Sequence, residues 1–236
     1  MHAVVLAGGK GTRLAPYTNV FPKALMPIGN MPILEVLLRQ MKTAGFDDVV
    51  LTVGHLSQLL EAFFQDGRRF GLNIRYSFED TPLGTAGPLA LVDGLLSTFL
   101  VCNGDILTTL DLKDLLNFHH ERKGIATIAM HHRQVNINLG VIQCNSNHEI
   151  TGYIEKPSLE YMVSMGIYIF EPEILNYIQP NVYLDFPDLV LKLLAADKKV
   201  YGYLFDGYWQ DLGNPDDFQQ AQLDFASMQS QFLMDE

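Results

Sequence analysis

Short apolar runs alternate with helical stretches through the first half of the chain, and this alternation limits the folds that it can adopt. Four runs rich in apolar residues end at turn residues, as buried strands do: residues 2–7, 48–53, 72–78 and 99–102. Helical stretches are predicted between them, from a cap near Asn30 to Gly45, over residues 57–65 and briefly after Gly84. The pattern predicts an α/β fold, a Rossmann-like three-layer α/β/α arrangement with a mostly parallel mixed sheet.

The pattern changes after about Gly124, where strands follow one another with fewer helices. Strands are predicted at residues 126–131, 139–143, 150–155, 165–170 and 200–205. Helices are predicted near residues 187–196 and from Asp216 to about Phe232. We therefore interpret residues 1–236 as a single domain in two halves, 1–124 and 125–236, in which the second forms a smaller lobe that closes over the first.

The charge balance excludes several classes of partner. With 16 Lys and Arg against 27 Asp and Glu, the chain has a formal net charge of −11, which argues against nucleic acid or an anionic membrane as partner. Residues 1–34 nevertheless contain Lys10, Arg13 and Lys23 and no acid. Cys102 and Cys144 lie in apolar contexts, so we expect two reduced core thiols and a cytoplasmic protein.

A glycine-rich loop follows the first predicted strand. It lacks the third glycine of a dinucleotide fingerprint, since Leu14 stands there, and it lacks the hydroxyl residue of a P-loop, since Gly11 follows Lys10. What remains is a flexible backbone at the carboxyl end of a strand, where open α/β sheets bind ligands. Its N–H groups could hold a phosphate that Arg13 grips, although a plain glycine turn with solvated cations fits the same residues.

A longer pattern resembles a known family. Residues 6–33 read LAGGKGTRLAPYTNVFPKALMPIGNMPI, and they are followed in order by PLGTAG at 82–87, NGD at 103–105, LGV at 139–141, EKP at 155–157, MGIY at 165–168 and WQDLG at 209–213. This series resembles the sugar-1-phosphate nucleotidylyltransferases, and PLGTAGPLAL is most similar to the guanylyltransferases that act on mannose or heptose 1-phosphates. The resemblance implies a nucleotide-binding half at 1–124 and a sugar-binding half at 125–236.

The implied reaction is attack by a sugar 1-phosphate on the α-phosphorus of a nucleoside triphosphate, with release of pyrophosphate. The resemblance gives Arg13, Lys23 and Asp105 catalytic roles, and it assigns Asp105 and Asp211 to Mg²⁺, a cation that prefers oxygen ligands. It also implies a set of nucleotide-binding positions that includes Arg13 and Lys23 and is completed by Leu6, Ala7, Gly8, Gly9, Gly11, Thr12, Glu79, Gly84, Thr85, Asn103 and Gly104.

Further positions would bind the nucleotide base and the sugar. Glu79 offers an acceptor-only carboxylate, which suits the two adjacent donors of guanine, so GTP is favoured; a solvated strand end is the alternative for this residue. The positions that the resemblance assigns to the sugar phosphate are Gly140, Glu155, Lys156, Ser164 and Gly166. Leu139 and Ser164 stand where the family commonly has an aromatic or other large residue and an asparagine, which leaves the sugar open.

Other functions were weighed against this one. A uridylyl- or thymidylyltransferase acting on glucose or another sugar 1-phosphate is the enzyme alternative. A glycosyltransferase is disfavoured because the chain has no Asp-x-Asp pair, and a catalytically silent regulatory subunit is disfavoured because Arg13, Lys23 and both aspartates are present. We expect no C-terminal β-helix domain, and a homo-oligomer interface and a docked terminal helix explain the apolar residues 232–234 equally well.

Overall fold

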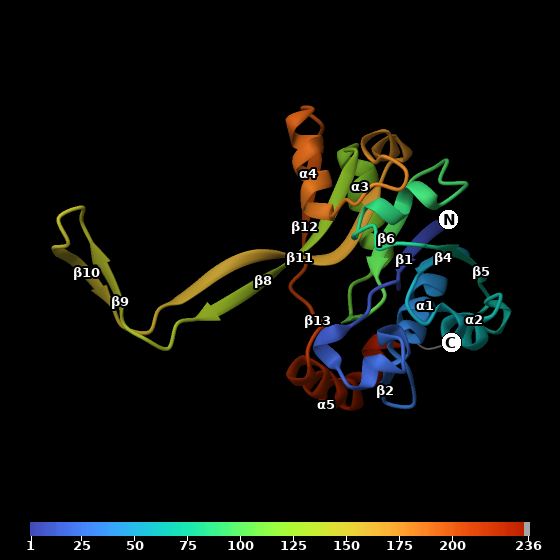
Figure 1. Ribbon diagram of the computed structural model, residues 1–236, viewed down its shortest axis with the longest axis horizontal. Coiled ribbons are helices and arrows are strands. Elements are labelled where there is room, and N and C mark those ends of the chain that lie inside the picture. Colours follow the sequence, from blue (N-terminus) through green and yellow to red (C-terminus); the bar gives the residue numbers. More distant parts are fainter. Residues whose placement is uncertain (234–236) are drawn as a thin grey trace.

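The computed structural model describes residues 1–233 and is built on one seven-stranded sheet (Figure 1). The strand order is β12-β8-β11-β6-β1-β4-β5. These strands are β1 (His2–Leu6), β4 (Asp48–Val53), β5 (Asn73–Phe78), β6 (Phe99–Asn103), β8 (Ala126–Asn136), β11 (Ser158–Phe170) and β12 (Val200–Leu204). All neighbours run parallel except β11, which is antiparallel to both β6 and β8. The predicted mostly parallel mixed sheet is confirmed.

Helices cover both faces of this sheet because its central strands are apolar on both sides. One face packs against α1 (Ile33–Thr43), α2 (Ser57–Phe64) and α3 (Leu112–Arg122), while the other packs against α4 (Phe186–Ala195) and 3₁₀ turns at Gly87–Leu91 and Pro172–Tyr177. In β1, Val5 faces the first layer and Val4 the second, and both are fully buried. The three-layer α/β/α architecture is therefore confirmed.

Two elements of the body escaped the sequence interpretation. Helix α3 begins after Asp111, whose carboxylate accepts a hydrogen bond from the Lys113 amide at 2.7 Å. A small sheet pairs β7 (Ile106–Thr108) with β13 (Trp209–Asp211), which places Asp211 opposite Ile106. This pairing brings two segments that are about a hundred residues apart in sequence to one side of the central sheet. Two further short strands of the body, β2 (Pro27–Ile28) and β3 (Met31–Pro32), pair with each other.

The terminal helix α5 (Pro215–Phe232) packs on the body. Phe232 is fully buried, stacks on Phe225 and meets the ring of Tyr208 edge-on. Docking of the helix therefore accounts for Phe232, while Met234 of the same apolar group lies outside the described residues. Within residues 1–233, none of the helices combines the length and apolar character needed to cross a membrane.

The second half does not close over the first as expected. Beyond the central sheet, β8 and β11 continue as a two-stranded ribbon that projects from the body and carries a second hairpin, β9 (Val141–Cys144) and β10 (Ile150–Ile154), at its end (Figure 1). We call residues 131–163 the arm. The expectation of two core thiols is wrong for Cys144, which is exposed on β9 in the arm, whereas Cys102 is buried in β6.

Candidate active site

The glycine loop leaves the sheet at the carboxyl end of β1, between two other strand ends. The Ala7 amide donates to the Thr52 carbonyl at the end of β4, and the Gly104 amide donates to the Leu6 carbonyl. Gly11 has a φ of 60°, and a Cβ there would lie 2.9 Å from the Thr18 side chain, so the loop needs glycine at this position. The chain thus presents bare backbone at the edge where α/β sheets bind ligands.

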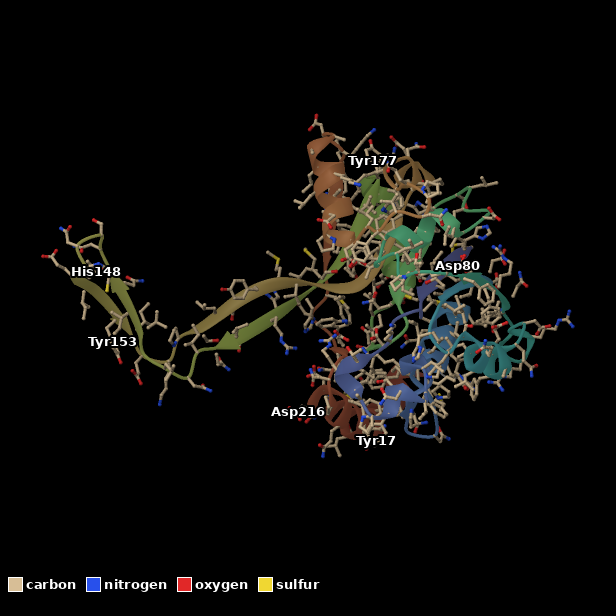
Figure 2. The ribbon with its side chains drawn as sticks, in the orientation of Figure 1. Tyr17, Asp80, His148, Tyr153, Tyr177 and Asp216 are labelled. Carbon is tan, nitrogen blue, oxygen red and sulfur yellow. The ribbon has the colours of Figure 1, made fainter. Side chains whose placement is uncertain are left out.

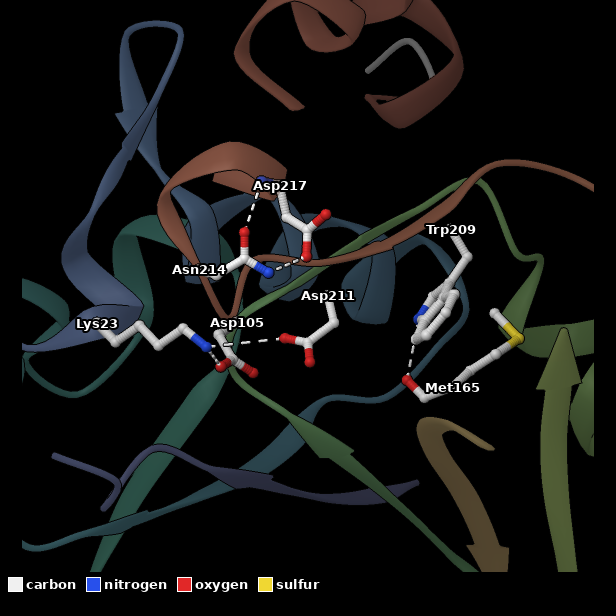
Figure 3. Close-up of polar contacts among 7 residues, drawn as sticks. All are labelled: Lys23, Asp105, Met165, Trp209, Asp211, Asn214 and Asp217. Atoms are coloured by element: carbon white, nitrogen blue, oxygen red, sulfur yellow. Dashed lines mark hydrogen bonds and ion pairs between the residues drawn. The ribbon is translucent and has the colours of Figure 1, made fainter. Parts of the chain in front are cut away.

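Four charged side chains from distant parts of the chain converge beside this loop, and Figure 3 draws three of them, Lys23, Asp105 and Asp211. Lys23, in the 3₁₀ turn Lys23–Leu25, donates to Asp105, and its Nζ lies 3.7 Å from Oδ1 of Asp211. Arg13, in the turn Thr12–Leu14, reaches the same place: a Cβ on Gly213 would lie 2.8 Å from its Nη2. The structure therefore brings together the residues that the sequence interpretation paired only through the family resemblance.

The surroundings of Asp211 destabilise its ionised form. Burial and the neighbouring carboxylate of Asp105 raise the pKa of Asp211, while Lys23 and Arg13 act in the opposite direction. A divalent cation would relieve this repulsion. No cluster of three or more His, Cys, Asp or Glu suited to a metal occurs among residues 1–233. Two carboxylates nevertheless fit Mg²⁺, which is usually held by one or two carboxylates together with water and substrate phosphates.

A cavity of about 820 Å³ extends from the glycine loop to the end of β5, and one of about 260 Å³ adjoins it. The larger is lined by Leu6, Gly8, Gly9, Glu79, Gly84, Thr85, Asn103 and Asp105 among the predicted residues. The smaller is lined by Leu6, Ala7, Gly9, Gly11, Thr12, Arg13, Lys23, Gly104 and Asp105. The predicted nucleotide-binding positions thus surround two connected spaces that share Asp105.

Glu79 and the loop after it form the far wall of the larger cavity. Glu79 Oε2 accepts from the Leu83 amide at 3.1 Å, and Oε1 lies 2.7 Å from where a Cβ on Gly8 would stand. Burial raises the pKa of Glu79, and the hydrogen bond from Leu83 opposes that shift. One carboxylate oxygen therefore fixes the loop, and the other faces the glycine turn. Gly84 has a φ of 80°, and a Cβ there would meet the Leu184 carbonyl at 2.6 Å.

Asp185 clamps this loop to the body and was not predicted. Its Oδ1 accepts from the amide and the hydroxyl of Thr85, at 2.9 and 3.1 Å, and its other oxygen accepts from Tyr183. The hydrogen bond from Tyr183 is the main reason that the pKa of Asp185 is lowered. Asp185 stands at the N-cap of α4, yet its side chain does not cap that helix. From the sequence, Asp185 could be expected only to cap α4, and its contact with Thr85 could not be predicted.

Thr52 is a second residue that the sequence interpretation missed. It lies at the end of β4, it lines the larger cavity and its side chain is 1% exposed. Among the buried side chains of residues 1–233, Thr52 Oγ1 is the polar atom that has no hydrogen-bond partner. A buried hydroxyl without a partner destabilises the fold, and Thr52 leaves one such group at the wall of the larger cavity.

The predicted sugar-phosphate positions divide into two groups. Gly166, with a φ of 74°, packs on Asn103 at the cavity edge: a Cβ on it would lie 2.5 Å from Asn103 Nδ2. Ser164 belongs to the same bulge and accepts from the Gly166 amide at 3.3 Å. Gly140, Glu155 and Lys156 lie instead in the arm, where the ribbon of β8 and β11 meets the hairpin of β9 and β10, and Tyr153 there packs across Gly140 and donates to Glu155 at 3.1 Å. The structure does not bring this second group to the cavities.

Comparison with known proteins places the chain in a family. The profile of the family described as nucleotidyl transferase matches residues 2–228. The chain belongs to the nucleotidyl transferase family. The UTP–glucose-1-phosphate uridylyltransferase of Synechocystis is 37% identical over 94% of this chain, and the mannose-1-phosphate guanylyltransferase of Mycobacterium tuberculosis is 35% identical over 95%. The match covers 62% and 64% of those two proteins, so the chain spans about three fifths of the length of these relatives.

Solved structures share the fold of this chain. A Bacillus anthracis protein described as a glucose-1-phosphate thymidylyltransferase superposes with a TM-score of 0.76 at 24% identity, covering 94% of each chain. HddC from Yersinia pseudotuberculosis superposes with a TM-score of 0.72 at 22% identity, covering 95% of this chain and 99% of its own. At these identities the likeness concerns the fold alone.

Proposed function

We propose that this chain transfers a nucleoside monophosphate from a nucleoside triphosphate, GTP in preference, to a sugar 1-phosphate, giving a nucleoside diphosphate sugar and pyrophosphate. The observation that carries the proposal is the convergence of Arg13, Lys23, Asp105 and Asp211 beside a glycine loop at the carboxyl ends of parallel strands. Curated relatives named as uridylyl- and guanylyltransferases of sugar 1-phosphates support the same reaction class.

The reaction needs positioning and charge neutralisation more than it needs a base. A phosphate monoester has a second pKa of about 6, so the sugar phosphate is mostly a dianion at neutral pH and is already nucleophilic. One of its oxygens attacks the α-phosphorus, and the bond from that phosphorus to the bridging oxygen of pyrophosphate breaks. Loop amides between Gly8 and Thr12 would hold the triphosphate, and Arg13 would neutralise charge that develops on the α-phosphate and the leaving group.

Asp105 and Asp211 would hold Mg²⁺, which supplies positive charge to the phosphate oxygens when bound. Lys23 links the two carboxylates. Lys23 would therefore hold the two carboxylates together before a cation binds. Once a cation neutralises the carboxylates, Lys23 would become free to contact a phosphate group. Substrate binding would in this way convert a closed ion-pair cluster into a site for polyanions.

The preference for GTP rests on Glu79. A carboxylate accepts from both adjacent donors of guanine, whereas uracil and thymine offer a single donor between two carbonyls. Glu79 lines the larger cavity opposite the glycine loop and is partly buried there. On the sugar side, Gly166 leaves the backbone bare beside Asn103, and Lys156 and Glu155 of the arm are proposed to bind phosphate and hydroxyl groups. The two cysteines are free, which supports a cytoplasmic setting.

The test is pyrophosphate release from a panel of nucleoside triphosphates combined with glucose, mannose, heptose and aminohexose 1-phosphates, with and without Mg²⁺. We expect release that requires both substrates and Mg²⁺ and is fastest with GTP. Glu79→Gln should narrow the preference for GTP over UTP. Absence of release in every combination would refute the proposed reaction, and release with UTP or dTTP but not GTP would refute the argument from Glu79.

A further inference from the structure

The arm is a two-stranded ribbon without a third strand or a helix against it. β12 pairs with β8 only as far as Met130, and β11 pairs with β6 only from Ile167 onward. Beyond these points β8 and β11 pair with each other alone, over residues 131–136 and 158–163. A two-stranded ribbon in water is marginally stable at best, because neither face is covered and neither edge is paired.

The arm exposes large apolar side chains of the kind that a sheet normally buries against another layer. Many large apolar side chains on it are 40 to 74% exposed, including Val135, Leu139, Ile150, Tyr153, Tyr161 and Met162. Figure 2 shows Tyr153 well away from the body, close to where the hairpin of β9 and β10 joins the ribbon, and His148 farther out at the tip. Together these side chains expose several hundred Å² of apolar surface, on the order of the largest patch found on monomeric proteins. The body of the same chain covers none of them.

The arm cannot reach the site of its own chain without being rebuilt. β8 runs unbroken from Ala126 to Asn136, and β11 pairs with it in a constant register from Ser158 to Ser164. Lys156 lies ten residues beyond Gly166, which is about 30 Å along an extended strand. To bring Lys156 over Asp105 of the same chain, both strands would have to break at the base of the arm and lose the pairing between them.

We propose that the arm is exchanged between two copies of this chain, so that each copy places its arm on the other and supplies Glu155 and Lys156 to the sugar side of the other's active site. The proposal rests on the proposed function, because it assigns these two residues to the substrate of that reaction. The partner is a second copy, since both the site that lacks these residues and the arm that carries them belong to the same sequence.

The size and the surface of the arm fit this partner. A stable interface takes about 800 Å² and some 20 to 30 residues from each side, and residues 131–163 are a segment of that size. A reciprocal exchange about a twofold axis buries two arms at once and forms a closed dimer. On the body, Phe78, Val182 and Tyr183 are exposed apolar side chains, and Tyr183 lines the larger cavity together with Glu79.

Sedimentation equilibrium tests the exchange without any substrate. We expect wild-type protein to be a dimer at micromolar concentration, and the variant Ile150→Asp with Tyr153→Asp to be a monomer with unchanged thermal unfolding of the body. Leu96→Asp is the matched control, because Leu96 is 89% exposed on the body and lies outside the arm. A wild-type monomer, or an arm variant that remains dimeric, would overturn the proposal.

Complementation tests which copy supplies Lys156. Arg13→Ala and Lys156→Ala should each be inactive alone. After co-expression, random pairing makes half of the dimers mixed and gives each mixed dimer one intact site, so activity should return to about one quarter of wild type. If Lys156 acts within its own chain, no site is intact and no activity returns. That outcome, or an active Lys156→Ala variant, would overturn the exchange. An inactive wild-type protein would refute the proposed function, and sedimentation would still decide the exchange.

Discussion

Replacing Asp211 by asparagine should separate the stability of the site from its activity. The side chain keeps its shape and loses its charge. The pKa of Asp211 is raised because burial and the charge of Asp105 outweigh the attraction of Lys23 and Arg13. The ionised form is therefore the less favourable one in the folded chain, so Asp211→Asn should unfold at the same or a higher urea concentration at neutral pH. Since the Asp211 side chain is 45% exposed, solvent screening limits the gain to less than about 1 kcal/mol.

The pH dependence of stability gives the sign of this effect. A carboxyl group with a raised pKa binds more protons in the folded than in the unfolded chain just above its ordinary value of 3.8. Stability of the wild type therefore falls as the pH rises from 3.8 to the raised value, and the Asp211→Asn variant lacks this fall. Urea unfolding across this range, compared between the two proteins, measures the difference directly.

The activity of the Asp211→Asn variant should fall, although its stability is kept or increased. The asparagine is a poorer ligand for a hard divalent cation, so we expect pyrophosphate release to fall by at least about 100-fold, equivalent to about 2.7 kcal/mol of transition-state stabilisation. Asp206→Asn is the control, because it makes the same change of charge at an exposed position five residues earlier. A variant that loses both stability and activity would refute the reasoning, because Asp211 would then be a structural ion-pair partner.

Three further substitutions test other parts of the site. Arg13→Ala should lower turnover by at least about 100-fold with unchanged circular dichroism, because Arg13 is exposed and contributes to charge neutralisation and not to the core; near-normal turnover would contradict its role. Thr52→Val should raise the free energy of unfolding by about 1 kcal/mol, since it removes a buried hydroxyl without a partner; a less stable protein in urea unfolding would contradict that reading. Asp185→Ala should raise KM for the nucleotide several-fold by releasing Thr85, whereas the exposed Asp188→Ala should not; equal KM values would show that the clamp does not position the loop.

Much of the central sheet could be predicted because its strands are continuous apolar runs that need no information from elsewhere in the chain. Helix α3 was missed although Asp111 is a good N-cap and Leu112, Leu115 and Leu116 form an apolar stripe. His119 continues that stripe and is 1% exposed, held by hydrogen bonds to Thr127 and Glu171. From the sequence alone, a histidine at this position counts as polar and interrupts the apolar stripe that would predict the helix. Only its tertiary contacts make His119 part of the core.

The site itself depends on long-range pairing. Asp105 and Asp211 lie near each other because β7 pairs with β13, and strands of three residues carry too little pattern to predict. Asp185 shows the same limit, since its local sequence indicates a cap and its side chain holds Thr85 instead. The arm is the largest case: within residues 131–163 the sequence predicts strands at 139–143 and 150–155, near β9 and β10, but not the extension of β8 to Asn136 or the start of β11 at Ser158. Nothing local tells whether such strands cover their own body or another.

Transfer of a labelled α-phosphate tests the central claim most directly. Purified protein is incubated with Mg²⁺, a sugar 1-phosphate and GTP labelled either at the α- or at the γ-phosphate, and the products are separated. The account predicts that the α-label appears in a nucleoside diphosphate sugar and the γ-label in pyrophosphate, in equal amounts. Retention of the α-label in GTP with every sugar 1-phosphate, or its appearance in free nucleotide only, would contradict it.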